Sequence, residues 1–241
     1  MKRAMGFRTA CATALLLAAS AGEAAAPAAP QSISASYNVL RNGGHVAVMH
    51  ESFEAADGRY RIVSESHAVG VLVLLAPHPL RVTSSGRLTG SGLTPLRFEG
   101  RRGDEDPRQV RAEFDWEGAQ LKVARSGRNE VLPLPPGTQD QLSIMYQFMF
   151  LEPDGTRELN LSRTTGRRIE QHRYSVRTGV ELDTPLGRMT TVHLARQHPP
   201  EESGVEIWLA PPLRYLPVKM LILDDDGSRY EQVLTRLEFK P

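Results

Sequence analysis

One apolar stretch, residues 138–150, stands between long segments in which polar and apolar residues alternate, and this contrast constrains the fold most. Its apolar side chains surround a helical axis and leave a thin polar stripe. Thr138 is a suitable N-cap, Gln141 lies three residues later as in a capping box, and Asp140 suits the positive end of the helix dipole. The stretch therefore predicts a helix over 138–150 that other elements must cover on most sides.

The segments on both sides of this helix carry the period of two that is typical of half-buried strands. In the clearest of them, Val110, Ala112, Phe114 and Trp116 alternate with charged residues. Strands, one central helix and strands again predict a mainly β protein, in which a curved antiparallel sheet forms a barrel or half-barrel with the helix packed on its concave side. Division into two domains at the helix is the alternative, but each half alone would expose a large apolar face.

The N-terminus has the basic, apolar and small-residue order of a secretory signal. Its apolar run, Ala10 to Ala21, is shorter than the ~20 residues that a transmembrane helix needs, so a signal peptide is favoured over a retained anchor. We expect residues 1–26 to be removed by cleavage near Ala26, residues 27–31 to form a flexible leader, and residues 32–240 to form a single β-rich domain. The predicted location is the periplasm of a Gram-negative bacterium, with the protein soluble there.

The charge of the exported chain bears on its partners, and its cysteine content bears on how the domain is stabilised. The formal net charge of +1 becomes −1 once three basic residues and one acidic residue leave with the signal peptide, so nucleic acid is not an expected partner. Cys11, the only cysteine, also leaves, and the core must stabilise the domain without disulfides. No later segment has the length of a transmembrane helix.

The sequence carries no motif that predicts catalysis, a cofactor or a metal. It contains no nucleophile elbow, phosphate-binding glycine loop or dinucleotide fingerprint. The histidines are scattered, and His45 and His50, five residues apart, would lie on opposite faces of a strand. The acidic run at Asp224 lacks the later carboxylate of a calcium loop, because Thr235 stands at that position. We therefore expect a protein that is not an enzyme and has no cofactor.

Two groups of apolar residues are candidates for binding. Aromatic and methionine side chains on the helix and on strands are suited to line an apolar cavity, although the same residues would also form an ordinary core. These candidate ligand-lining residues are Met145, Tyr146, Phe148, Met149, Phe114, Trp116 and Trp208. The apolar run Val69–Ala76 is read as a buried element, with an exposed lip as the alternative; in that alternative Val71, Leu72 and Leu74 form a docking segment.

Four groups of short motifs extend over nearly the whole chain after the signal peptide. They are Ser85-Gly86-Arg87-Leu88 with Gly92-Leu93-Thr94-Pro95-Leu96-Arg97-Phe98, Gly137-Thr138-Gln139-Asp140 with Tyr146-Gln147-Phe148, Leu182-Asp183-Thr184-Pro185-Leu186-Gly187, and Ile207-Trp208-Leu209-Ala210-Pro211 with Leu216-Pro217-Val218. With these motifs the sequence resembles an exported bacterial family called domain of unknown function 3108. The resemblance implies a periplasmic β-rich protein and supplies no activity or catalytic residues.

In the order of its short motifs, the last quarter of the chain is also similar to the periplasmic lipoprotein carriers of the LolA and LolB kind, whose curved sheets hold acyl chains. The similarity rests on Trp208-Leu209-Ala210-Pro211, Leu216-Pro217-Val218-Lys219 and Asp225-Asp226-Gly227-Ser228. The preferred hypothesis is a periplasmic protein that binds a lipid or other hydrophobic envelope molecule in an apolar groove. The alternatives are a structural or protein-interaction module in envelope assembly and an envelope hydrolase.

Overall fold

The structure is a computed structural model that describes residues 30–103, 106–197 and 204–240. The predicted signal peptide and most of the predicted leader lie outside these residues. The last leader residue, Gln31, accepts a hydrogen bond from the amide of Ala55. The elements are β1 (Ser32–Arg41), β2 (Gly44–Ala56), β3 (Arg59–Ala68), η1 (Gly70–Leu74), β4 (Leu80–Thr89), β5 (Gly92–Arg102), β6 (Val110–Asp115), β7 (Gln120–Arg125), β8 (Arg128–Pro133), β9 (Gln139–Asp140), α1 (Ser143–Leu151), β10 (Glu158–Thr164), β11 (Ile169–Thr184), β12 (Gly187–Arg196), β13 (Gly204–Ala210), η2 (Pro211–Leu213), β14 (Leu216–Leu223) and β15 (Arg229–Lys240).

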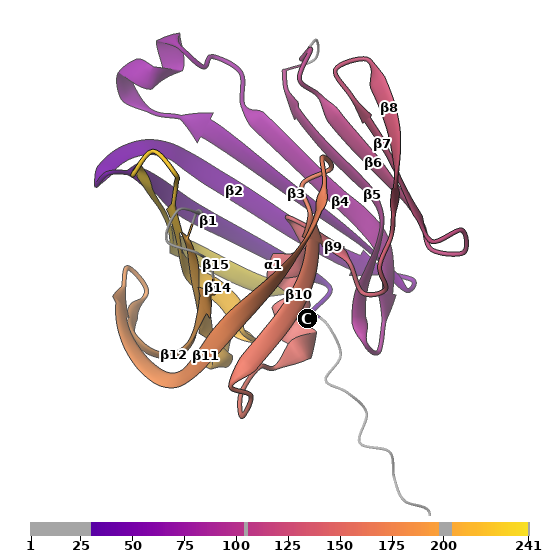
Figure 1. Ribbon diagram of the computed structural model, residues 1–241. Helices are drawn as coiled ribbons and strands as arrows, with labels where there is room; N and C mark the ends of the chain where they lie inside the picture. Colours follow the sequence, from indigo (N-terminus) through magenta and orange to yellow (C-terminus); the bar gives the residue numbers. More distant parts are fainter. Residues whose placement is uncertain (1–29, 104–105, 198–203, 241) are drawn as a thin grey trace, which may run out of the picture.

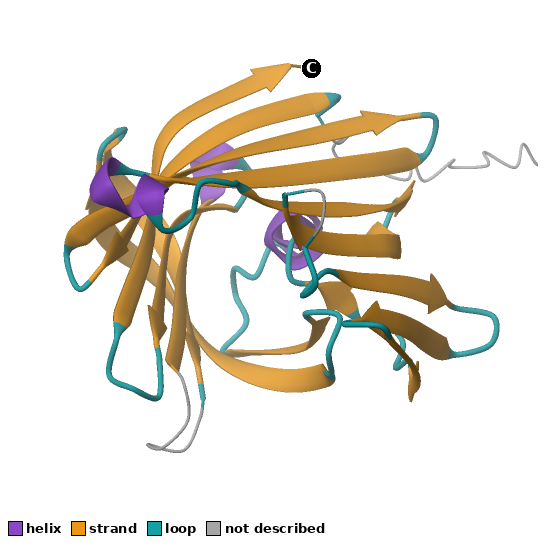
Figure 2. Ribbon diagram, turned by 90° about the horizontal axis from the view of Figure 1, so that it is seen from above, coloured by secondary structure: helices purple, strands orange, loops and turns teal. Residues whose placement is uncertain are grey.

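All described strands belong to one sheet, in the order β8-β7-β6-β5-β4-β3-β2-β1-β15-β14-β13-β12-β11-β10-β9. The first and last strands, β1 and β15, pair antiparallel in the middle of the sheet. Strands β2–β8 form a first arm and β9–β14 a second arm, and the arms curl towards each other with α1 between them (Figures 1 and 2). The edge strands β8 and β9 are not paired with each other among the described residues. The predicted curved sheet with a central helix is thus confirmed, in its half-barrel form.

The helix begins later than the sequence predicts. Residues 139–140 form the short strand β9, which pairs in parallel with β10, and α1 starts at Ser143. The predicted N-cap is therefore wrong, since the hydroxyl of Thr138 donates instead to the carbonyl oxygen of Pro135. Asp140 takes the capping role: its Oδ1 accepts from the amide of Ser143 at 2.8 Å, and its own amide donates to Ser143 Oγ at 3.0 Å. This reciprocal pair has the geometry of a capping box.

Helix α1 holds the two arms together. Tyr146 stacks on Phe53 of the first arm, with ring centroids 5.3 Å apart, and belongs to the core cluster of that arm. Phe148 is fully buried in the core cluster of the second arm, beside Leu194 and Ile207. Both arms therefore cover the helix, as its apolar composition requires.

The apolar run Val69–Ala76 is not buried, and the favoured interpretation of it is wrong. It forms the short 3-10 helix η1 between β3 and β4, where Val71, Leu74 and Leu75 are 80%, 85% and 82% exposed. The run connects β3 and β4 at one end of the first arm, outside the interior of the half-barrel (Figure 1). Since no described element covers its outer side, a sequence as apolar as a core segment remains at the surface.

Candidate functional site

The two arms meet along one edge of β5. Strand β6 pairs with only the 97–100 part of β5, which leaves the backbone around Leu93 without a neighbouring strand on that side. Two glutamine side chains take that place. Gln147 Oε1 accepts from the amide of Leu93 at 2.7 Å, while Gln139 Nε2 donates to its carbonyl oxygen at 2.8 Å. Gln147 Nε2 also donates to the carbonyl oxygen of Ser91. We call this contact between β5, β9 and α1 the seam.

Two further features fit the seam closely. Gly92 has φ +105°, and a Cβ atom there would lie 2.4 Å from Gln147 Oε1, so glycine alone admits the amide. Trp116 continues the seam beyond Leu93, because its Nε1 donates to the carbonyl oxygen of Pro95 at 2.7 Å. The edge of β5 is thus satisfied by side chains, which keeps its backbone groups from being buried without partners.

Behind the seam lies a buried carboxyl group. Asp140 is 0% exposed, and its Oδ2 accepts from the hydroxyl of Ser84 on β4 at 2.6 Å. The Ser84 hydroxyl is in turn 3.0 Å from that of Tyr60 on β3. Burial raises the pKa of Asp140, and the hydrogen bonds from Ser84, Ser143 and Leu142 oppose this rise. Since both its oxygens have donors and no water reaches it, we assign Asp140 a structural role in joining the arms.

An open cleft of about 1100 Å³ borders the seam on its outer side. Its apolar surface comes from the first arm, α1 and β10, and its polar surface carries basic groups. Among the described residues that line it there is no carboxylate. The lining residues are Arg87, Ser91, Leu93, Thr94, Trp116, Pro136, Gly137, Gln139, Ile144, Gln147, Leu151, Asn160, Leu161, Ser162, Gln171, His172 and Arg173. The cleft is therefore both amphipathic and positively charged.

Two buried polar atoms in the lining residues have no hydrogen-bond partner among the described residues, Gln139 Oε1 and His172 Nε2. His172 Nε2 is 3.3 Å from Glu170 Oε2, but this approach does not have hydrogen-bond geometry. Burial, and then the charges of Arg196 and Arg163, lower the pKa of His172, which favours the neutral imidazole. Such atoms usually obtain a partner from water or a ligand. No group of three or more His, Cys, Asp or Glu side chains in the described part of the chain is arranged to hold a metal ion.

Of the seven predicted ligand-lining residues, Trp116 lines this cleft. Four others, Phe114, Tyr146, Phe148 and Met149, are buried in the core, and Met145 packs against the clusters of both arms. Trp208 is partly buried in a third core cluster, with Lys219 Nζ 5.3 Å from its ring centroid. The helix residues that do reach the cleft are Ile144, Gln147 and Leu151.

A second buried carboxyl group lies on the inner face of the first arm. Glu51 of β2 is 8% exposed, and Tyr146 of α1 donates its hydroxyl proton to Glu51 Oε2 at 3.0 Å. Burial raises the pKa of Glu51 to about 7, against the opposing hydrogen bonds from Tyr146 and Ser64. Its side chain faces the core between Met49 and Phe53. The pKa of this carboxyl group, at the contact between the helix and the sheet, is therefore close to neutral pH.

The polar residues of the cleft were not predicted. In the sequence Gln139 and Gln147 stand out only as members of the family motifs, although a glutamine inside an otherwise apolar helix, such as Gln147, is a usable signal for a buried side-chain hydrogen bond. Arg87, His172 and Arg173 come from distant strands. Nothing in their local sequence distinguishes them from solvated strand residues.

Comparison with known proteins identifies the family. The model of the family described as "Protein of unknown function (DUF3108)" matches residues 32–235. The chain belongs to this family. The match contains the seam, the cleft and both buried carboxyl groups, so all of them lie within the family domain. Among curated proteins, none matches the sequence.

One solved structure has a similar fold at low sequence identity. A β-barrel-like protein of the domain of unknown function DUF1849 from Brucella abortus has a TM-score of 0.57 and 13% identity, covering 86% of this chain and 97% of that one. A putative lipoprotein from Parabacteroides distasonis has a TM-score of 0.32 and 10% identity, covering 87% and 97%. The first of these supports the fold alone. The likeness to lipoprotein carriers stays a prediction, and no helix in the described ranges is long and apolar enough to cross a bilayer.

Proposed function

We propose that this member of the family is a non-enzymatic binding protein of the periplasm, which holds a lipid or similar amphipathic envelope molecule in the cleft beside the seam. The apolar part of the ligand lies against Trp116, Ile144 and Leu151. Its acidic group lies towards Arg87 and Arg173. The secretory signal in the sequence supports the location.

The observation that carries this proposal is the composition of the cleft. A cleft of about 1100 Å³ is large enough for an acyl chain with its headgroup. Basic side chains without a lining carboxylate favour a ligand that bears negative charge.

The same composition argues for binding over hydrolysis. An envelope hydrolase would need carboxylates or histidines gathered in one cleft. The described lining residues provide one histidine, His172, whose lowered pKa and burial suit it poorly to exchange protons with a substrate. We therefore propose a carrier or sensor of its ligand rather than an enzyme.

The test uses the full chain exported by a Gram-negative host. Lipid extraction and mass spectrometry should recover an acidic lipid, and a fluorescent fatty acid should bind and quench Trp116 in a Trp208→Phe background. Leu151→Glu, on the cleft, should weaken that binding at least tenfold. Leu186→Glu is the matched control, since Leu186 is 38% exposed, as Leu151 is 37% exposed, but lies on the β11–β12 turn. Absence of both lipid and probe binding would refute the proposal.

A second candidate function is docking to an envelope protein through η1. The observation that favours it is a group of aliphatic side chains that are exposed to water: Val71, Val73, Leu74 and Leu75. Exposed apolar patches of this kind often mark interaction sites. Cross-linking in the native periplasm should capture a partner that is lost in Val71→Asp/Leu74→Asp. The control is Val131→Asp, at a 60% exposed position on β8. Cross-links that persist in the double variant would exclude η1 as the docking site.

A further inference from the structure

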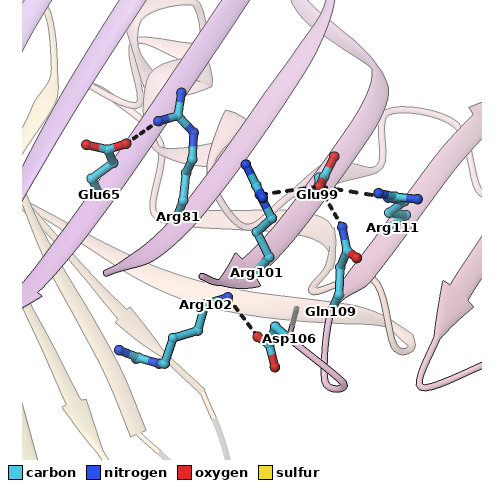
Figure 3. A network of polar contacts seen from close by, with 8 residues as sticks. All are labelled: Glu65, Arg81, Glu99, Arg101, Arg102, Asp106, Gln109 and Arg111. Atoms are coloured by element: carbon cyan, nitrogen blue, oxygen red, sulfur yellow. Dashed lines mark hydrogen bonds and ion pairs between the residues drawn. The ribbon is translucent and has the colours of Figure 1, made fainter. Parts of the chain in front are cut away.

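A second hollow lies on the opposite face of the first arm. Thr83 and Ser85 of β4 alternate with the buried Val82 and Ser84, so their side chains project from the outer face of the sheet. Around these two short side chains the long residues of β3, β5 and β6 enclose a volume of about 520 Å³. We call this hollow the arginine groove, after the residues that line it: Arg61, Arg81, Arg97, Arg101 and Arg111, with Glu99 and Glu113. Figure 3 shows its polar contacts at one end.

The strand register concentrates positive charge in this groove. Arg81 of β4 stands directly opposite Arg101 of β5. Like charges in this relation destabilise a sheet. Ser85 has Arg61 opposite on β3 and Arg97 opposite on β5. Ser85 thus has an arginine opposite it on both sides, whereas Thr83 has Val63 opposite on β3 and Glu99 opposite on β5.

The carboxylates in and beside the groove neutralise only part of this charge. Glu65 pairs with Arg81, and Glu99 is 3.8 Å from both Arg101 Nε and Arg111 Nε (Figure 3). Glu99 also accepts a hydrogen bond from Gln109 at 2.7 Å. With five arginines and two glutamates, the lining carries a formal charge of +3.

Two of the arginines are available to a ligand. The side chains of Arg61 and Arg97 are exposed, and neither forms a hydrogen bond or ion pair with another residue in the ranges that the structure describes. Glu113 is opposite Arg97 in the register without an ion pair between them. A smaller hollow shares Arg61 and Arg81 and is lined by Glu54 and Glu65, which limits the positive region on the β2 side.

We propose that the arginine groove binds a ligand that carries two or more phosphate groups. A guanidinium group donates two parallel hydrogen bonds to an oxyanion. A phosphate group has enough oxygen atoms to accept hydrogen bonds from two arginines and a hydroxyl group at once. A carboxylate group has only two oxygen atoms for these three donors. Arg61, Arg97 and Ser85 form one such set. Arg81 and Arg101, with Thr83 between them, form a second set in which a phosphate group must compete with the carboxylates of Glu65 and Glu99. The site is on the face of the sheet opposite α1 and is independent of the cleft ligand.

The probe for this site is inorganic tripolyphosphate, titrated into the full mature chain by calorimetry. Arg61→Gln/Arg97→Gln should weaken binding at least tenfold. The control, Arg128→Gln/Arg167→Gln, removes the same charge from exposed positions outside the groove and should change affinity less than twofold. Equal weakening in both double variants, or no binding by the wild type to any phosphate probe, would overturn the proposal.

Further measurements identify the chemical class of the ligand and its source. Citrate should bind at least tenfold more weakly than tripolyphosphate, and equal binding would overturn the preference for phosphate. Vesicles of phosphatidylglycerol, with phosphatidylcholine vesicles for comparison, separate a lipid-borne phosphate from a free one. Sedimentation with phosphatidylglycerol that is lost in Arg61→Gln/Arg97→Gln would assign the site to lipid headgroups. Binding of tripolyphosphate without such sedimentation would assign it to soluble phosphate.

Discussion

Glu51 should make the stability of the protein depend on pH, and Glu51→Gln should remove this dependence. Burial raises the pKa of Glu51 from 4.5 to about 7. Between these values the folded protein keeps the proton while the unfolded chain loses it. The folded state therefore binds more protons, and the resulting stability, present below pH 4.5, is lost as pH rises through about 7. Glutamine keeps an oxygen that can accept from Tyr146 and carries no charge at any pH.

The magnitude follows from the pKa difference. Each pKa unit corresponds to about 1.4 kcal/mol, so the shift of Glu51 is equivalent to roughly 3 kcal/mol over the whole range. Most of it, about 2.5 kcal/mol, falls between about pH 5 and about pH 8. The free energy of unfolding of Glu51→Gln, minus that of the wild type, should increase by this amount over the interval. Contributions of other groups, such as Asp140, are common to both proteins and cancel.

The assay is urea unfolding of both proteins at four pH values, followed by far-UV circular dichroism. Glu54→Gln is the matched control, because it removes a carboxyl group from a solvent-exposed position on the same strand, and the change measured for Glu51→Gln is compared with the change measured for this variant. A difference for Glu51→Gln that varied by less than about 0.5 kcal/mol, well below the change expected from linkage, would refute the assignment of a protonated Glu51 in the folded state.

The remaining predictions concern the contact between the arms. Tyr146→Phe should lower the free energy of unfolding by about 1 to 2 kcal/mol and move the Glu51 titration to higher pH, because the lost hydrogen bond holds that pKa down; an unchanged urea profile would contradict this. Asp140→Ala should cost about 3 kcal/mol, since it removes the buried hydrogen bond from Ser84 and leaves the amides of Leu142 and Ser143 at the start of α1 without their acceptor; Asp140→Asn, as the comparison, should cost less in the same urea titration. Gly92→Ala should displace the Gln147 amide and reduce hydrogen-exchange protection in α1; protection equal to the wild type would show that the seam tolerates a side chain.

The alternation of residues predicted the two faces of β6 correctly. In β6, Val110, Ala112 and Phe114 are buried, while Arg111 and Glu113 are exposed. The alternation does not account for Glu51, a charged residue on the inner face of β2. A charged side chain at a core position is recognised only when its partner is known, and Tyr146 is 95 residues away in the sequence.

The start of the helix and the candidate site depended on contacts that a local pattern does not contain. Thr138 and Asp140 are both good capping residues, and the pairing of β9 with β10 decided between them. The cleft is assembled from β4, β5, α1, β10 and β11, so its basic lining appears only after the arms meet. The family motif Gly137-Thr138-Gln139-Asp140 contains residues of the seam, but the motif alone did not predict that they contact β5.

The sequence by itself determined the class of the protein: a mainly β chain with one apolar helix, organised by a period of two and by turn residues, both of which are local properties of the backbone and of side-chain placement. Tertiary structure decided where apolar residues are exposed and where polar residues are buried. The apolar run at η1 stays in water because it lies at the end of a hairpin, and the polar Asp140, Gln139 and Glu51 are buried where groups distant in the sequence form hydrogen bonds with them. Burial is a property of the whole assembly, and its energetic sign depends on which groups meet there.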